Sequence, residues 1–366
     1  ASEALNGAPV ISITQNGGSV VPVPVSLDTG NTYKGMYYVV AAYEGKAVVN
    51  VSGTDRAGNS GSSVAYFSVD TTLPEFRLIS FDPNPAKAGN VNVAFKVSED
   101  MADVAVNVNG NSAALSATTN DRYTFTYQVS VSDKQGSATV AISGHDLAGN
   151  SGSIADTSLI IDTIDPEFSN FTYSPNPAAN DPVIISFAVS ETLLEDPALT
   201  INGKSAALLS KNGNRYSYRY IVTATDSEGP AALSVSGNDL ANNLGAQSAS
   251  DFIIDLTPPS FSLVAVDPAI AKQGEARISF RASEVLLSPP LVSVNGRSTV
   301  YISQTGNDYI YSYAVSASDT QGAATVKIFG TDLANNSGTQ LETPFSIDTV
   351  SPSVTVSGIN PNPFTP

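Results

Sequence analysis

The chain of 366 residues lacks several residue types on which catalysis and cross-linking commonly depend. It has no cysteine, which excludes disulfide bonds, thiolate metal ligands and cysteine nucleophiles. It has no tryptophan and a single histidine, His145, which we interpret as an ordinary loop residue. Because the chain also has no Gly-x-Ser-x-Gly, His-Glu-x-x-His or phosphate-loop motif, the sequence predicts that it is not an enzyme.

Charge is scarce and mostly of one sign. Charged residues make up 14% of the chain, and 34 acidic residues against 17 basic ones give a formal net charge of -17. Nucleic acids and anionic membrane surfaces attract a basic face, so we exclude them as partners, whereas this balance suits cations. No apolar run approaches the ~18 residues that a membrane-spanning helix needs.

A repeated pattern organises the whole chain. The segments VDTTLPEF, IDTIDPEF, IDLTPPSF and IDTVSPSV place aspartates at positions 70, 162, 255 and 348, which are 92, 93 and 93 residues apart. A second marker, GTDRAGN, GHDLAGN, GNDLANN and GTDLANN, begins at positions 53, 144, 237 and 330. A Ser-Glu pair recurs with the same spacing. Three markers with one period indicate a tandem array of one kind of module.

The aspartates of the first marker set the expected module boundaries. Three whole modules are predicted, residues 70–161, 162–254 and 255–347. Residues 1–69 match only the later strands of a module, and residues 348–366 match its first strand, as the start of a further module or as a donor strand. We expect the chain to be processed or cut from something longer, because it begins without methionine and shows no signal peptide.

Within a module, apolar and polar residues alternate, as is typical of strands with one buried face. Val91, Val93 and Phe95 alternate with Asn92 and Ala94. A tyrosine-rich strand recurs at 123–131, 216–222 and 309–315, and we interpret its tyrosines as core residues rather than a carbohydrate platform. Asn-Gly pairs at 109–110, 202–203 and 295–296 suit type I′ hairpin turns, in which both central residues have positive φ.

The strand pattern predicts the fold class. In the first whole module we expect seven strands, near 74–82, 91–98, 103–108, 112–117, 122–131, 137–144 and 154–161. Seven short antiparallel strands in a module of this length are typical of an immunoglobulin-like sandwich. The chain is therefore predicted to be all-β, a tandem array of seven-stranded immunoglobulin-like β-sandwich modules.

The pattern Gly-x-Asp-x-Ala-Gly/Asn-Asn, followed by a strand that ends in Asp and then by Pro, resembles the tandem bacterial immunoglobulin-like repeats of large surface adhesins. GHDLAGN at 144–150 followed by IDTIDPEF at 161–168 carries the resemblance best, and the likeness covers essentially the whole chain. It implies a secreted or surface-displayed stalk, often stiffened by calcium at the junctions between modules.

The loops of an antiparallel module alternate between its two ends, so acidic residues distant in sequence are expected to meet at each junction. We predict three acid sets as candidate calcium ligands. The first acid set is Asp70, Glu99 and Asp146; the second is Asp162, Glu191 and Asp239, with Asp133 from the preceding module; the third is Asp255, Glu284 and Asp332, with Asp226 from the preceding module.

Two interpretations of these acids stay open. Neighbouring carboxylates repel one another, and a Ca²⁺ ion with about 6–8 oxygen ligands would turn that repulsion into attraction. Alternatively, the Asp of the Asp-x-Ala-Gly-Asn motif caps its own turn, and the junction Asp accepts backbone N–H groups.

The sequence thus predicts a non-enzymatic, extracellular structural stalk or fibre segment of a bacterial surface protein. Its partners would be neighbouring modules or copies of the same chain, with any cell-surface or carbohydrate receptor bound through parts outside this sequence. Two other functions stay open. One is a filament subunit in which residues 348–366 of one copy complete residues 1–69 of the next; most of the second strand would still be missing unless Val21–Val25 replaces it. The other is an accessory region of a secreted hydrolase.

Overall fold

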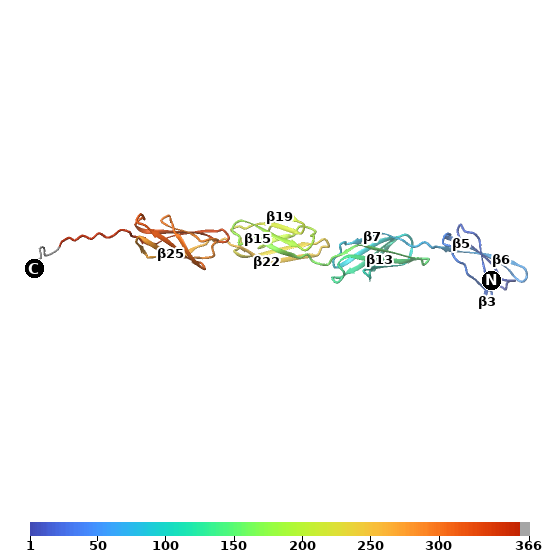
Figure 1. The fold of residues 1–366 in the computed structure, drawn as a ribbon. Coiled ribbons are helices and arrows are strands. Elements are labelled where there is room, and N and C mark those ends of the chain that lie inside the picture. Colours follow the sequence, from blue (N-terminus) through green and yellow to red (C-terminus); the bar gives the residue numbers. More distant parts are fainter. Residues whose placement is uncertain (359–366) are drawn as a thin grey trace. The chain divides into compact units, whose positions relative to one another are not determined.

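The computed structural model describes residues 1–358, which form strands, turns and loops without any helix (Figure 1). The all-β prediction is therefore confirmed for these residues. None of them belongs to a helix that could cross a membrane. The chain divides into two compact units, Ala1–Ile164 and Asp165–Pro366.

Residues 76–161 of the first unit hold two four-stranded sheets. The strands are β7 (Phe76–Asp82), β8 (Gly89–Val97), β9 (Met101–Val108), β10 (Asn111–Ser112), β11 (Ala114–Thr119), β12 (Arg122–Val129), β13 (Gly136–Asp146) and β14 (Ser151–Ile161). One sheet has the order β11-β12-β8-β7 and the other has the order β10-β9-β13-β14.

The alternating pattern of the sequence places the core between these two sheets. Val91, Val93 and Phe95 of β8 are at most 1% exposed, while the side chain of Asn92 between them is exposed. Val140 and Ile142 of β13, in the other sheet, are fully buried in the same cluster. Apolar surface of this kind contributes roughly 25 cal/mol per Å² removed from water, so the alternation stabilises a two-layer fold.

The predicted strand at 112–117 is divided in the structure. Its first part, β10, pairs with β9, and its second part, β11, pairs with β12 in the opposite sheet. The chain changes sheets at Ala113, whose N–H donates to the carbonyl of Val106. Residues 76–161 consequently hold eight strands where the sequence predicted seven, because alternation alone does not show which sheet a strand joins.

The Asn-Gly turns are confirmed. Asn109 and Gly110 have φ of 51° and 87°, and the pairs at 202–203 and 295–296 have positive φ as well. The Oδ1 atom of Asn109 accepts the N–H of Thr139 at 2.9 Å, so the turn is also tied to β13.

The second unit repeats this arrangement in residues 168–254. The strands are β15 (Phe168–Ser174), β16 (Pro182–Val189), β17 (Ala198–Ile201), β18 (Lys204–Ser205), β19 (Ala207–Asn212), β20 (Arg215–Ile221), β21 (Gly229–Asn238) and β22 (Leu244–Ile254). They form the sheets β15-β16-β20-β19 and β18-β17-β21-β22.

Residues 261–347 repeat it again with one extra short strand. The strands are β23 (Phe261–Asp267), β24 (Ile270–Ala271), β25 (Gly274–Ala282), β26 (Leu291–Val294), β27 (Arg297–Ser298), β28 (Val300–Thr305), β29 (Asp308–Val315), β30 (Gly322–Thr331) and β31 (Ser337–Ile347). The sheets are β23-β25-β29-β28 and β24-β31-β30-β26-β27, with β24 parallel to β31.

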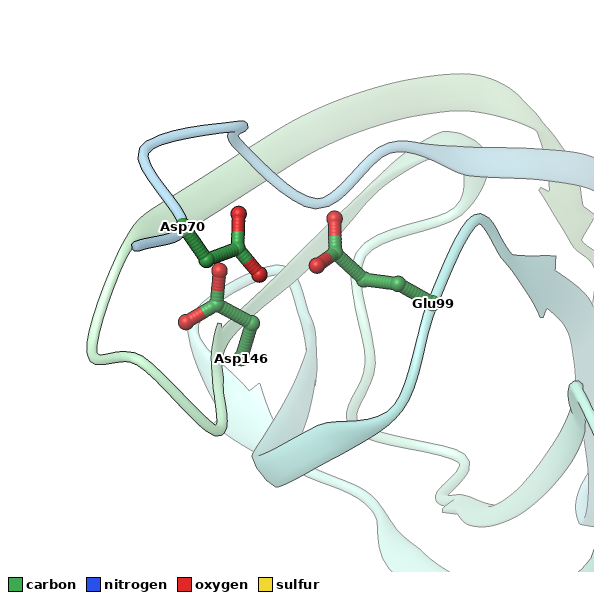
Figure 2. Close-up of side chains that lie close together, drawn as sticks. All are labelled: Asp70, Glu99 and Asp146. Carbon is green, nitrogen blue, oxygen red and sulfur yellow. The ribbon is translucent and has the colours of Figure 1, made fainter. Parts of the chain in front are cut away.

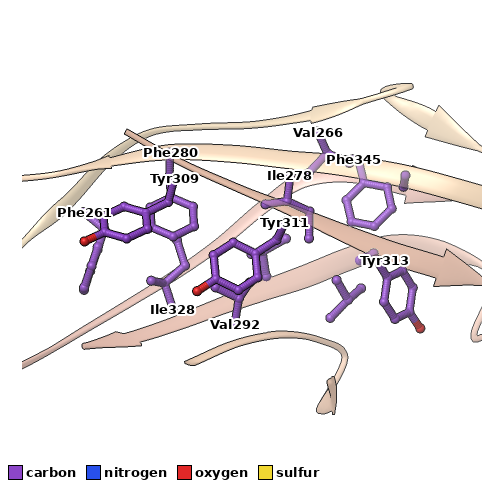
Figure 3. Packing of buried hydrophobic residues seen from close by; sticks show 14 of the residues in the cluster. Phe261, Val266, Ile278, Phe280, Val292, Tyr309, Tyr311, Tyr313, Ile328 and Phe345 are labelled. Carbon is purple, nitrogen blue, oxygen red and sulfur yellow. The ribbon is translucent and has the colours of Figure 1, made fainter. Parts of the chain in front are cut away.

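The tyrosine-rich strand faces the core, as expected. Tyr309, Tyr311 and Tyr313 of β29 are at most 4% exposed, and the rings of Tyr309 and Tyr311 stack on Phe280 with centroids 5.5 and 5.8 Å away (Figure 3). These rings fill the interior that a tryptophan or disulfide fills in other sandwiches.

Residues 1–69 contain fewer strands. These are β1 (Val10–Thr14), β2 (Val21–Val23), β3 (Val25–Thr29), β4 (Thr32–Gly35), β5 (Gly45–Thr54) and β6 (Ser60–Val69). The sheet β2-β1-β5-β6 has four strands, whereas β3 and β4 pair only with each other. Val21–Val25 does not replace the missing second strand, because Val21–Val23 pairs with β1 as β10 pairs with β9.

The described part of the C-terminal segment, residues 348–358, contains no strand. The rest of the predicted first or donor strand, residues 359–366, lies outside the described residues.

A bulge in the first strand of each sandwich generates a stability prediction. Leu263 has φ of 55° at the register shift between Ser262 and Ala265 and is 73% exposed. Leu78 is likewise exposed and has positive φ at a register shift. The equivalent residue in β15 is Asn170, a type that tolerates this conformation. Leu263→Asn should therefore raise the free energy of unfolding by about 1 kcal/mol in chemical denaturation. Leu287→Asn, an exposed leucine without positive φ, is the control and should give no gain; an equal gain would contradict the strain argument.

Candidate metal centres

The first acid set comes together at one end of residues 76–161. Asp70 follows β6, Glu99 follows β8, and Asp146 ends β13. Figure 2 shows the three carboxylates pointing toward one another, and one oxygen from each lies within 4.8 Å of the others. Asp70 is exposed, Glu99 is half-buried and Asp146 is buried. The predicted convergence of these three residues is present.

The turn after β13 fixes the position of Asp146. Its Oδ1 atom accepts the N–H groups of Ala148 and Asn150, each at 2.8 Å, and its Oδ2 atom accepts the Asn150 side-chain amide at 2.7 Å. Gly149 takes φ of 90° inside this turn. The turn-capping interpretation is therefore correct for this residue, and the cap holds the carboxylate beside Glu99.

The same turn holds the linker that carries Asp70. The Asn150 amide also donates to the backbone carbonyl of Asp70 at 3.1 Å, and Asp70 accepts the N–H of Thr72 at 3.1 Å. Gly152 lies against the linker so closely that a Cβ there would stand 2.1 Å from the carbonyl oxygen of Pro74. Glycine at this position lets the linker pack on β14.

The electrostatics of the first acid set follow from this confinement. Burial, then the charges of Asp70, Asp146 and Glu44, raise the pKa of Glu99 above its ordinary value. Burial would also raise the pKa of Asp146, but hydrogen bonds from Asn150 and the turn outweigh it and lower that pKa. Asp146 is therefore held in its ionised form, whereas the ionised form of Glu99 is disfavoured.

The third acid set has the same construction in the second unit. Asp255, Glu284 and Asp332 offer oxygens within 4.8 Å of one another, and Asp332 is fully buried. The Asn336 amide bridges the Asp332 carboxylate and the Asp255 backbone carbonyl, at 2.9 Å each. Burial followed by the charges of Asp255 and Asp332 raises the pKa of Glu284, and burial followed by Asp332 raises that of Asp255.

The second acid set is divided between the two units. Asp162 follows β14 in the first unit, whereas Glu191 and Asp239 belong to the second. Asp239 is fully buried and accepts the N–H and the side-chain amide of Asn243, both at 2.8 Å, as the other turn aspartates do. The gathering of this set stays a prediction from the repeat.

Asp226 does not join the third acid set, which corrects the expectation. It accepts the Tyr220 hydroxyl and the Thr223 N–H, both at 2.8 Å, and lies 2.6 Å from Lys204 Nζ. Burial opposes ionisation, but the Lys204 ammonium and these hydrogen bonds prevail and lower its pKa to about 2. Asp133 likewise accepts the Tyr127 hydroxyl and the Ser130 N–H, both at 3.0 Å. Both aspartates are occupied by donors of their own sandwich, and a different residue of the same loop contacts the linker.

The residue that contacts the linker stands two positions after these aspartates, and the sequence pattern did not single it out. Glu44, Gln135, Glu228 and Gln321 each precede a glycine that opens a strand, Gly45, Gly136, Gly229 or Gly322, and each contacts the following linker. Their regular spacing was a usable signal, but the mixture of Glu and Gln hid it in a search for recurring acids. With Glu44 and Glu228, the first and third acid sets each have a fourth carboxylate nearby.

The remaining candidate, His145, lies in an exposed position beside Asp103. The ring Nδ1 is 3.0 Å from Asp103 Oδ1, and this contact is the first cause of the lowered pKa of Asp103. An exposed pair of this kind contributes little to stability. Its geometry agrees with the interpretation of His145 as a loop residue.

No family model and no curated protein matches the chain. Solved structures do: a Ca²⁺-stabilized adhesin that helps an Antarctic bacterium reach out and bind ice has 17% identity, and the likeness covers 93% of this chain and 90% of that chain with a TM-score of 0.38. A tetra-tandem repeat from the extending region of a large adhesion protein has 20% identity, 96% and 94% coverage and a TM-score of 0.39. A 1.5-MDa bacterial ice-binding adhesin has 18% identity, 77% and 100% coverage and a TM-score of 0.39. The chain is thus similar to tandem repeats of large bacterial adhesins.

The raised pKa values generate a pH prediction for protein in EDTA. An ionised carboxyl whose folded pKa is raised destabilises the fold, and protonation relieves that penalty as the pH falls toward the unfolded value of about 4.3 for Glu. Lowering the pH from about 7 to about 5 should therefore raise the melting temperature in calorimetry. Below about pH 4 the trend should reverse, because groups with lowered pKa such as Asp226 lose stabilising charge.

The control variants identify the source of the rise. Glu284→Gln should remove the part of the rise that its own sandwich contributes, whereas Glu275→Gln, on the exposed side of β25, should leave it intact. A melting temperature that falls steadily from pH 7 downward would contradict the electrostatic account.

Proposed function

We propose that the chain is a non-enzymatic structural stalk segment of a bacterial surface protein, built from tandem immunoglobulin-like sandwiches whose junctions bind calcium. The proposed modules are residues 70–161, 162–254 and 255–347, each a sandwich of two sheets in which the fourth predicted strand is divided between the sheets. One observation carries the proposal: the same acid set recurs beside the linker that leads into a sandwich, once in each unit.

The residues at these two positions suit a hard cation. Each acid set offers oxygen ligands only, and Ca²⁺ takes about 6–8 oxygens from carboxylates, carbonyls and water. Two unit charges about 4 Å apart repel by ~1 kcal/mol in water and by ~4 kcal/mol at an effective dielectric constant of about 20. Because hydrogen bonds fix the turn aspartate, movement relieves little of this repulsion, and a divalent cation would remove it.

The position of the sets supports a mechanical rather than a chemical task. Asp70 and Asp255 belong to linkers, while their partners belong to the sandwich that follows, so an ion bound by both would restrain the linker against that sandwich. An acid set that recurs in both units offers no single cleft in which to gather a substrate. The similarity to adhesin structures, one of them described as Ca²⁺-stabilized, agrees with this proposal without carrying it.

The proposed setting is the extracellular surface. Neighbouring modules and copies of the chain would be the direct partners, and any receptor would bind parts outside this sequence. The millimolar calcium affinity that suffices for extracellular modules fits partly buried sets of three or four carboxylates.

A second candidate function, head-to-tail assembly, is favoured by one observation. The sheet of β3 and β4 lacks the two strands that its counterpart β11-β12-β8-β7 has. Val49 and Val51 are consequently only half-buried, whereas the equivalent Val140 and Ile142 are fully buried. Apolar strands from another copy would cover this face. Sedimentation from micromolar to near-millimolar concentration tests this, and a monomer throughout would contradict it.

Calcium titration tests the main proposal. If the sets bind with a dissociation constant of about 0.1–1 mM, calcium at about 2 mM should stabilise each binding sandwich by about 0.7–1.8 kcal/mol. For a domain of fewer than about 100 residues that raises the melting temperature by roughly 3–14 °C relative to EDTA. Calorimetry with about 2 mM CaCl₂ and with EDTA measures the shift, and magnesium at the same concentration controls for ionic strength.

Variants show whether the acid sets cause the shift. Glu99→Gln with Glu284→Gln should remove most of it, whereas Glu275→Gln should retain it. An unchanged melting temperature of the unaltered chain in calcium would reject calcium at the junctions.

A further inference from the structure

Four side chains at equivalent positions of the repeat form hydrogen bonds with the linkers that follow them. They are Glu44, Gln135, Glu228 and Gln321, and each bonds to linker residues 27 to 29 positions further along. We call these contacts linker latches. Two of them, Glu44 and Glu228, lie beside an acid set, but all four are distinct from the acid sets because each joins the sandwich before a linker to the linker itself.

Two latches are carboxylates. Glu44 accepts the N–H of Thr71 at 3.2 Å, the hydroxyl of Thr71 at 2.6 Å and the hydroxyl of Thr72 at 2.8 Å. Glu228 accepts the N–H of Leu256 at 2.8 Å and the hydroxyl of Thr257 at 2.7 Å.

The other two latches are neutral amides with the same reach. Gln135 Oε1 accepts the N–H of Thr163 at 2.9 Å, and its Nε2 donates to the Thr163 hydroxyl at 2.9 Å. Gln321 makes the same pair of bonds with Thr349, at 2.8 Å each. Hydrogen bonding to the linker therefore does not require a charge at this position.

The charge has an electrostatic consequence instead. Glu44 is among the charges that raise the pKa of Glu99, and Glu228 is among those that raise the pKa of both Glu284 and Asp255. Each carboxylate latch thus repels the acid set beside its own linker, whereas a glutamine has no net charge with which to do so. In the absence of a cation, two interactions act on a carboxylate latch in opposite directions. Hydrogen bonds attract it to the linker, and the charges of the acid set repel it.

We propose that Glu44 and Glu228 make their linkers calcium-controlled, whereas Gln135 and Gln321 hold their linkers with or without calcium. This inference rests on the proposed function, because it needs an ion at the acid set. Calcium cancels the repulsion and lets the carboxylate latch close, and its removal loosens the linker. The chain then contains two classes of joint, set by a choice between Glu and Gln at one position.

The absence of cysteine allows a direct test on the full chain. Cysteines introduced as Ser250→Cys and Ser288→Cys, at exposed positions on either side of the linker at 255–260, take one spin label each. Double electron–electron resonance then reports the width of the distance distribution between the labels. We expect calcium to narrow it at least twofold relative to EDTA, and Glu228→Gln to keep it narrow in both conditions.

The reciprocal change provides the matched control. Gln135→Glu, measured with labels on either side of the linker at 162–166, should convert a calcium-independent joint into a calcium-dependent one. Calorimetric binding of calcium to the unlabelled chain is measured in parallel.

The outcomes separate the two proposals. If the unaltered chain binds no calcium and its distribution does not respond, the proposed function fails. If it binds and responds but Glu228→Gln responds equally, only the latch inference is overturned. A Glu228→Gln distribution that is broad in both conditions also overturns it, since the carboxylate would then be needed to hold the linker at all.

Discussion

Like charges that cannot move apart are the constraint on which the junctions of this protein depend. Asp146 is buried and held by three hydrogen bonds from its own turn, and the same turn grips the carbonyl of Asp70 through Asn150. The repulsion with Glu99 is therefore built in by contacts that stabilise the turn and the linker. Only protonation or a cation relieves it, so the solution conditions decide how much of this repulsion the junction carries.

The sandwiches themselves depend on a different and simpler interaction. Each buries a row of aromatic and aliphatic side chains between two sheets, such as Phe280 with Tyr309 and Tyr311. A domain of fewer than about 100 residues gains only a modest surplus from such burial. A repulsion of a few kcal/mol at a junction is then a considerable fraction of the whole.

Much of this architecture could be predicted from the sequence because alternation and turn chemistry are local. The alternation at 91–97 was enough to predict a strand, and Asn109-Gly110 was enough to predict a hairpin turn. The sheet change at Ala113 could not be predicted, since it depends on which strand lies across the interior. Convergence of Glu99 with Asp146 followed from loop order alone. Asp226 was misplaced because its partner, Lys204, lies on a strand whose position the sequence does not give, and a buried carboxylate takes the nearest donors available.

The latch position could not be predicted from recurring acids for a related reason. Glu228 and Gln321 differ in type, yet both accept the N–H of the linker residue 28 positions further along, so the shared property is an acceptor oxygen at a fixed reach. Where two residue types satisfy the same geometry, the difference between them must act through charge. The charge of Glu228 acts on Glu284 and Asp255, and nothing in the hydrogen bonding of the linker requires it. A position that is constant in geometry and variable in charge is therefore where the properties of a joint can change without altering the sandwiches on either side.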